Sequence, residues 1–129
     1  MAVCAVLLTT SLSGVLPVRV DRHQTFHVIL DAIDANSDTP RVAAYGCLEP
    51  TWVFYGGRPI RELPCEPEQA AKYLAMSDDH FLITTDRWHP DLEGKLPEDT
   101  TVLAETPYFM QNKTLLLLGR PKMPVGERK

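Results

Sequence analysis

The spacing of hydrophobic residues changes repeatedly along the chain and predicts helices alternating with strands. Apolar residues recur at helical spacing within residues 21–35, after a capping-box pattern that begins at Asp21, so this segment is predicted to be an amphipathic helix. Acidic residues on both sides of Pro67 are favourable at a helix start and predict a second helix over residues 67–76. The polar residues 86–95 have room for a short helix. Strands are predicted over residues 41–45, 51–55, 59–63, 80–85, 101–104 and 114–118.

Two continuous apolar runs indicate strands that are covered on both faces. They are FLI at residues 81–83 and LLLL at residues 115–118, and both are predicted to occupy central positions in a sheet. The helix over residues 67–76 is suited to cross over between parallel strands, whereas tight links near Gly56 and Asn112 favour antiparallel neighbours. The expected fold class is therefore α/β, with a mixed β-sheet flanked by helices.

Length and composition agree with a single small domain, which is predicted over residues 19–120. A chain of 129 residues has room for one core, and such a core buries roughly two thirds of the surface of the unfolded chain. A hydrophobic content of 44% and a charged content of 23% are ordinary for a globular protein. The net charge of −4 argues against nucleic acid as a main partner.

An apolar segment, residues 1–18, precedes the predicted domain and contains no charge. Its length is at the lower edge for a membrane-spanning helix, and Gly14 and Pro17 weaken a continuous one. It lacks the basic start and the clear cleavage site of a signal peptide. We expect this segment to be the end of a transmembrane helix or to be disordered. Residues 121–129 contain two prolines and a glycine and are predicted to be a flexible tail.

The most informative segment is YGCLEPTWVFYGGRPIR, residues 45–61, where two predicted strands meet at a loop. Loops on a rigid sheet often carry function, and this one contains Glu49, Tyr55, Arg58 and Arg61. The arginines would supply charge-assisted contacts to a phosphate, and Tyr55 would supply a flat amphipathic ring. The alternative interpretation is ordinary turn chemistry, in which Arg58 pairs with a glutamate across the turn.

The same segment carries a resemblance to a known family. GCLEPTWVFYGGRPI, residues 46–60, resembles a recurrent segment of polyprenyl-phosphate-dependent membrane glycosyltransferases, the protein mannosyltransferase and aminoarabinose transferase-like enzymes. In the C-terminal soluble region of that family, a strand ending in Phe-Tyr is followed by a small-residue turn, an Arg and an apolar strand, as in residues 54–60 here. The order of the later helices and strands also fits, so the resemblance covers residues 17–120.

The resemblance implies a place in a larger enzyme. The chain would be an accessory C-terminal domain on the extracytoplasmic (periplasmic) face, in contact with the membrane-embedded part of a parent glycosyltransferase and with a lipid-linked sugar or acceptor. The family's catalytic acidic residues lie in loops between earlier membrane helices, so the resemblance implies no catalytic residue in this chain.

Common catalytic motifs do not occur in the sequence, which contains no GxSxG, GxxxxGK[ST], HExxH or GxGxxG. The nearest reactive cluster is Asp86, His89 and Asp91, whose side chains suit metal binding or acid–base chemistry. Such residues in a polar loop more often only interact with solvent, so neither a metal site nor a cofactor is predicted. Trp52 and Trp88 are candidates to stack on a sugar ring, although Trp52 begins a predicted strand and is expected to pack within the domain instead.

The cysteines Cys4, Cys47 and Cys65 have neither zinc-site nor CxxC spacing. Cys47 and Cys65 flank the loop, and they either pair in an oxidising compartment or serve as small buried hydrophobic residues. The second interpretation is favoured, because sequence alone does not bring the two Cα atoms within bonding range.

These observations leave three classes of function. The leading hypothesis is the non-catalytic accessory domain of a membrane glycosyltransferase that takes its sugar from a polyprenyl-phosphate donor. The alternative is a free-standing small α/β ligand-binding protein or enzyme that uses the loop around Tyr55 and Arg58. A protein-interaction module is the third class.

Overall fold

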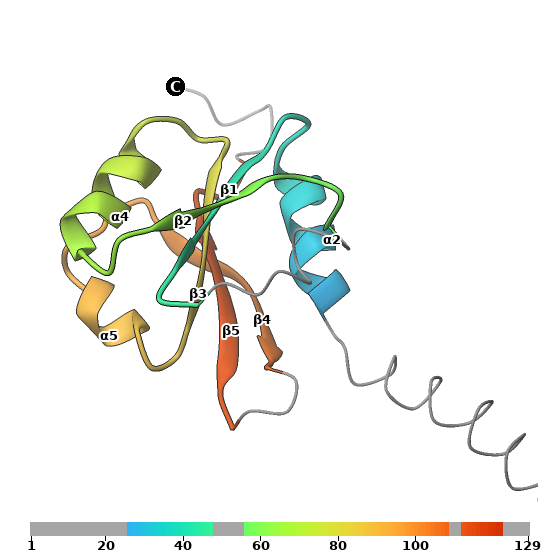
Figure 1. Ribbon diagram of the computed structural model, residues 1–129. Coiled ribbons are helices and arrows are strands. Elements are labelled where there is room, and N and C mark those ends of the chain that lie inside the picture. The colour runs from blue at the N-terminus through green and yellow to red at the C-terminus, as the bar shows by residue number, and fades with distance from the viewer. Residues whose placement is uncertain (1–25, 48–55, 109–111, 123–129) are drawn as a thin grey trace, which may run out of the picture.

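Helices and strands alternate along the chain, as the hydrophobic pattern predicts. The computed structural model describes residues 26–47, 56–108 and 112–122, and this part of the chain contains five strands and three helices (Figure 1). In chain order they are α2 (Phe26–Asn36), β1 (Arg41–Tyr45), β2 (Ile60–Leu63), α4 (Pro67–Ala75), β3 (His80–Thr85), α5 (His89–Leu92), β4 (Thr101–Pro107) and β5 (Thr114–Gly119).

The strands form one mixed sheet in the order β2-β1-β3-β5-β4. β1 pairs in parallel with both β2 and β3, while β5 is antiparallel to β3 and to β4. The helix α4 connects β2 to β3, because two parallel strands need a long crossover between them. β4 and β5 are antiparallel neighbours, as the link near Asn112 predicts. The prediction of an α/β fold with a mixed sheet is confirmed.

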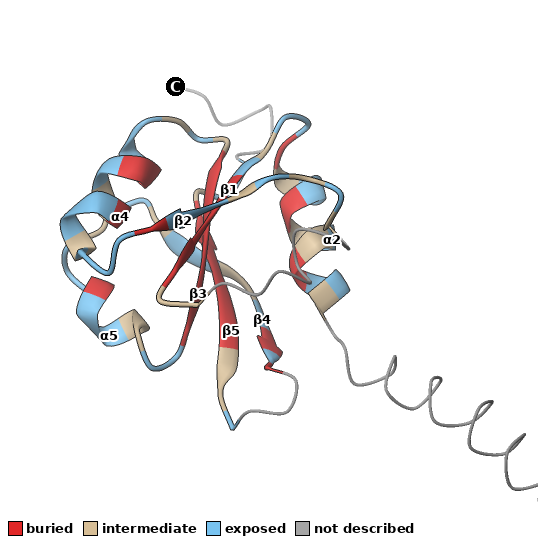
Figure 2. Ribbon diagram, in the orientation of Figure 1, coloured by how far each residue is buried: buried red, intermediate tan, exposed pale blue. Residues whose placement is uncertain are grey.

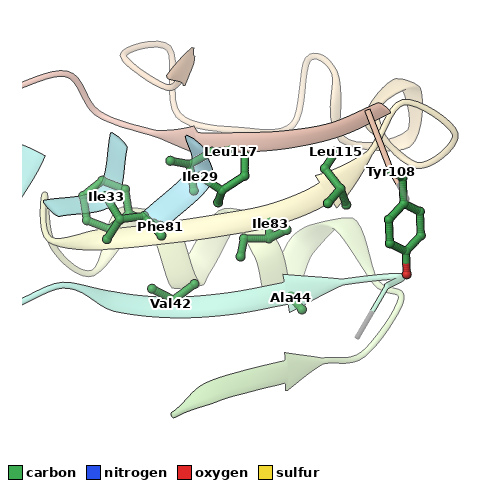
Figure 3. Close-up of a cluster of buried hydrophobic side chains, with 9 residues drawn as sticks. All are labelled: Ile29, Ile33, Val42, Ala44, Phe81, Ile83, Tyr108, Leu115 and Leu117. Atoms are coloured by element: carbon green, nitrogen blue, oxygen red, sulfur yellow. The ribbon is translucent and has the colours of Figure 1, made fainter. Parts of the chain in front are cut away.

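Helices cover both faces of the sheet, which explains the two continuous apolar runs. Ile29 and Ile33 of α2 pack on one face, over a cluster that includes Phe81, Ile83 and Leu117 (Figure 3). The opposite face lies under α4 and α5 and forms the second cluster, made of Ala43, Tyr45, Leu63, Ala70, Tyr73, Leu74, Leu82, Leu92 and Leu118. β3 is buried along its whole length, and both β3 and β5 are central strands, as predicted (Figure 2).

The two cysteines of the described part have different surroundings. Cys47 is half-buried and packs against the α2-side cluster, as a small hydrophobic residue would. Cys65 is exposed, so its prediction as a buried residue is wrong. The reason is its position in the short link between β2 and α4, where the backbone runs at the surface.

Several predictions fall on residues outside the described part. They concern the apolar segment 1–18, the start of the first helix at residues 21–25, the strand over residues 51–55 and most of the tail. Within residues 26–47, 56–108 and 112–122, no helix has the length and apolar character that a bilayer crossing requires.

Candidate functional site

Of the four predicted site residues, the two that are described, Arg58 and Arg61, lie apart. Glu49 and Tyr55 lie outside the described residues. Arg58 is half-buried on the α2 side, where its Nη2 atom lies 2.7 Å from Oδ1 of Asp34 in an ion pair. The sequence interpretation pairs Arg58 with a glutamate across the turn, whereas its carboxylate partner among the described residues is Asp34 of α2.

Arg61 lies on the opposite face of the sheet from Arg58. It is exposed on the edge strand β2, opposite Ala43 of β1, and Ala43 belongs to the cluster under α4. Side chains paired across a sheet point to the same face, so Arg61 faces the α4 side. Of the predicted residues that are described, Arg61 alone is a free cation for a ligand.

In an open α/β sheet, ligands commonly bind where the chain leaves the carboxyl ends of two neighbouring strands in opposite directions. β1 and β3 meet this condition. After β1 the chain rejoins the described part at Gly56, beside Leu30 of α2, whereas after β3 it continues into α5 on the other face. The fold therefore predicts a ligand site at the crevice between the carboxyl ends of β1 and β3.

Trp88 fills this crevice. Its indole lies directly over Gly46 at the end of β1, so close that a Cβ atom on Gly46 would lie 2.6 Å from the ring. The ring also packs edge-on against Tyr45, with 6.2 Å between ring centroids. Trp88 is thus a packing residue.

The amino ends of the same strands carry a row of nitrogen-rich side chains on the α4 face. Arg41 of β1 is directly opposite His80 of β3. Arg61 of β2 is opposite Ala43, which follows Arg41 by two positions in β1. Since side chains alternate between faces along a strand, these three side chains share one face. We call Arg61 and Arg41 the cationic row, which has His80 at its inner end.

An open groove of about 370 Å³ lies along the cationic row. Its volume is within the range of small-molecule sites. The walls are mostly apolar, and Met76 at the rim is a strongly exposed hydrophobic side chain (72%). The groove is lined by Pro40, Arg41, Val42, Pro59, Ile60, Arg61, Tyr73, Met76 and His80.

Tyr73 and His80 form the inner end of the groove. Their rings stack with 4.5 Å between centroids and planes only 8° apart. Nδ1 of His80 lies 2.6 Å from the carbonyl oxygen of Tyr73, and because a carbonyl only accepts, Nδ1 carries the proton. Burial raises the pKa of the Tyr73 phenol to about 12, although Arg61 and Arg41 act in the opposite direction. Tyr73 therefore remains a neutral hydrogen-bond donor at physiological pH.

No carboxylate of the described residues pairs with Arg41 or Arg61; the ion pairs found there involve Arg58 and Arg120. The carboxylate of Asp79, which precedes His80, accepts a hydrogen bond from the hydroxyl of Ser37 at 2.6 Å. Two exposed guanidinium groups that share one face without a counter-charge attract an anion. The groove is suited to bind one by charge-assisted hydrogen bonds.

The predicted reactive cluster of Asp86, His89 and Asp91 does not form a ligand set. Asp86 and Asp91 are exposed, and His89 begins the short helix α5. Across the described ranges, no group of three or more His, Cys, Asp or Glu side chains is arranged to hold a metal ion.

Sequence reasoning found Arg61 but missed Arg41, Tyr73 and His80. Arg41 stands at the start of a strand and His80 at the start of another, and each has an unremarkable local context. The sequence does contain one indication of the site, because Arg41 and His80 each begin a predicted strand. Only the parallel register of β1 and β3 shows that the two residues lie side by side.

The sequence matches no family model, no curated protein and no solved structure. The class of protein is therefore described by its fold and its groove. It is an α/β domain with a cationic, apolar-walled groove at the amino ends of three parallel strands.

Proposed function

We propose that this chain is a non-catalytic binding domain that holds an anionic ligand in the groove beside the cationic row. The observation that carries the proposal is that Arg41 and Arg61 lie on the same face of the sheet, and that neither has a carboxylate partner among the described residues. A bound anion would supply the missing counter-charge, and guanidinium groups bind carboxylates and phosphates with two parallel hydrogen bonds.

The walls of the groove indicate the rest of the ligand. Pro40, Pro59 and Met76 offer aliphatic surface next to the two guanidinium groups. Burying apolar surface is favourable by about 25 cal/mol per Å², so a ligand with an aliphatic part beside its charge fits better than a bare ion. A phosphate attached to a hydrocarbon chain has this combination.

The family resemblance gives the proposal a narrower form. As the accessory, extracytoplasmic C-terminal domain of a membrane glycosyltransferase, the chain would hold the phosphate of a polyprenyl-linked sugar or position an acceptor beside the membrane-embedded part of the enzyme. The apolar, cationic groove supports this form, because a polyprenyl phosphate is both anionic and aliphatic. The alternative of a free-standing ligand-binding protein uses the same groove.

A competing interpretation is purely structural. The groove adjoins the end of α4, and cations are favourable near the C-terminal end of a helix. If Arg41 and Arg61 only served this purpose, replacing them would lower stability and would leave ligand binding unchanged.

Titration calorimetry with farnesyl phosphate separates the two interpretations. We expect the wild-type chain to bind farnesyl phosphate, and to bind farnesol and inorganic phosphate more weakly, because each has only half of the recognised chemistry. Arg41→Ala and Arg61→Ala should each raise the dissociation constant roughly tenfold or more, since a hydrogen bond to a charged group contributes about 1.5–3 kcal/mol. Arg87→Ala is the matched control, because Arg87 is an exposed arginine at the opposite end of the sheet.

The proposal fails if the wild-type chain does not bind farnesyl phosphate, or if the groove variants bind as tightly as Arg87→Ala. The narrower form is tested on the native protein from its source cells. A parent glycosyltransferase would be extracted from membranes and would have a mass far above the 14.5 kDa of this chain. A free protein of 14.5 kDa in the aqueous fraction would overturn that form and leave the binding proposal standing.

A further inference from the structure

One residue of the groove has an oxygen donor in addition to its apolar ring. Tyr73 belongs to α4 and reaches the groove from above the sheet, whereas Arg41 and Arg61 reach it from two neighbouring strands. The three polar groups therefore approach the groove from three different elements. Two of the donors therefore come from the sheet and one from the helix that covers it.

The ring of Tyr73 is held in place independently of any ligand. It is 7% exposed and stacks on His80 with the planes 8° apart. The hydrogen bond from Nδ1 of His80 to the backbone oxygen of Tyr73 fixes the imidazole beneath it. A side chain held in this way loses little conformational freedom when a ligand binds, which favours affinity.

The phenol of Tyr73 lies within the electrostatic reach of both arginines, and Arg61 has the larger effect. Its pKa of about 12 keeps the proton on the oxygen at every pH at which the domain would function. The hydroxyl group is therefore available as a donor near the two guanidinium groups, which are also donors and never acceptors.

We infer that Tyr73 is a specificity-determining residue of the groove, and that its hydroxyl group donates the third hydrogen bond to an oxyanion held by Arg41 and Arg61. The inference rests on the proposed function and names the ligand class more closely. Three donors, two from the sheet and one from the helix, select an oxyanion with an oxygen for each. A phosphate monoester offers three such oxygens, whereas a carboxylate offers two, and a bidentate guanidinium group engages both and leaves only their remaining lone pairs to the other donors.

The test uses Tyr73→Phe, which removes one oxygen and keeps the stacked ring. We expect this variant to bind farnesyl phosphate about tenfold more weakly than the wild-type chain, and to bind farnesoic acid, the carboxylate with the same kind of chain, with unchanged affinity. Tyr45→Phe is the matched control, because Tyr45 is a buried tyrosine under the same helices whose ring faces Trp88 at the other end of the sheet.

A spectroscopic readout makes the result independent of small changes in stability. Farnesyl phosphate should produce a tyrosine difference spectrum in the near ultraviolet with the wild-type chain and with Tyr45→Phe. The same ligand should produce none with Tyr73→Phe. A purely structural role of Tyr73 would change the melting temperature of the variant and would leave the difference spectrum of the wild-type chain without a tyrosine signal.

The possible outcomes separate this inference from the proposed function. If Arg41→Ala and Arg61→Ala lose affinity while Tyr73→Phe binds farnesyl phosphate like the wild-type chain, the inference is wrong and the proposed function stands. If Tyr73→Phe loses affinity for the phosphate and the carboxylate equally, the donor role stands and the selection of a phosphate is wrong. If the wild-type chain binds neither compound, the proposed function fails and the inference fails with it.

Discussion

Gly46 is a position where the backbone and the packing both require glycine. Its φ of +68° lies in the left-handed region, which side chains with a Cβ atom rarely adopt. A Cβ atom there would also lie 2.6 Å from the indole of Trp88. The close approach of this indole is what closes the crevice between the ends of β1 and β3, so the choice of glycine has a consequence for where a ligand can bind.

We predict that Gly46→Ala lowers the free energy of unfolding by about 2–5 kcal/mol, because backbone strain and overpacking add. Gly57→Ala is the control, since Gly57 also has a positive φ (+59°), but a Cβ atom added there would meet no other atom within 4 Å. Strain alone should cost that variant about 1–2 kcal/mol. Urea denaturation of both variants measures the difference, and equal losses would contradict the role given to Trp88.

Tyr73 gives a prediction about alkaline stability. Its folded pKa of about 12 is above its ordinary value of 10.0 because burial disfavours the phenolate. The folded state therefore keeps the proton to higher pH than the unfolded state, and the stability that follows is complete below about pH 10 and is lost as pH rises toward about pH 12.

The measurement is the free energy of unfolding between about pH 9 and about pH 11. It should fall more steeply with pH in the wild-type chain than in Tyr73→Phe, which has no phenol to ionise. Some slope should remain in the variant, because burial also raises the pKa of Tyr45. Identical slopes in the two proteins would show that the Tyr73 phenol ionises as easily in the folded chain as in the unfolded one.

At the scale of elements, the central strands β3 and β5 hold the core together. Ile83 is fully buried between β1 and β5, in the cluster covered by α2. We predict that Ile83→Ala costs about 2–5 kcal/mol of unfolding free energy, through lost burial and the cavity it leaves. Leu116→Ala should fall at the lower end of that range, because Leu116 is 8% exposed.

Val102→Ala on the edge strand β4 is the control for these two variants, since Val102 is 44% exposed. It should change stability by no more than about 0.5 kcal/mol. Chemical denaturation with a loss below about 1 kcal/mol for Ile83→Ala would contradict its place in a fully packed central strand.

The elements themselves could largely be predicted from the sequence, because local patterns determine them. The runs at residues 81–83 and 115–118 identified the two central strands, and Pro67 with its acidic neighbours identified the start of α4. The ends were less accurate. β4 extends to Pro107 instead of ending near residue 104, since pairing with β5 continues past the apolar residues.

The candidate site could not be predicted in the same way, because it depends on contacts between distant segments. Arg58 and Arg61 are close in sequence, yet the structure places them on opposite faces of the sheet. Arg41 and His80 are far apart in sequence, and the parallel pairing of β1 and β3 brings them together. Local spacing contains no record of this pairing, which is determined by the α4 crossover and by burial on both faces.

At the scale of the whole molecule, the sheet consists of a parallel part, β2-β1-β3, and an antiparallel hairpin, β4-β5. The backbone joins the two parts between β3 and β5, and Arg120 adds a side-chain connection. Arg120 follows β5 and pairs with Asp78, just before β3, and with Asp99, just before β4. One guanidinium group therefore connects three segments at the end of the sheet where the groove lies.

We predict that Arg120→Met lowers the free energy of unfolding by about 1–2 kcal/mol at low ionic strength, because two charge-assisted contacts are lost together. The loss should shrink at about 1 M salt, where exposed charges are screened over a few ångströms. Arg58→Met is the matched control, because the two arginine side chains are similarly exposed (22% and 24%) but Arg58 pairs with a single carboxylate of the described part, that of Asp34.

A single ion pair of this kind contributes no more than about 1 kcal/mol, so Arg58→Met should be the milder variant. Urea denaturation at low and high salt provides the comparison for both. Equal losses for the two variants, or a loss for Arg120→Met that does not respond to salt, would mean that the connection through Arg120 adds nothing beyond an ordinary surface pair. If the difference is found, the two ion pairs of Arg120 act together and fix the ends of β3, β4 and β5 relative to one another.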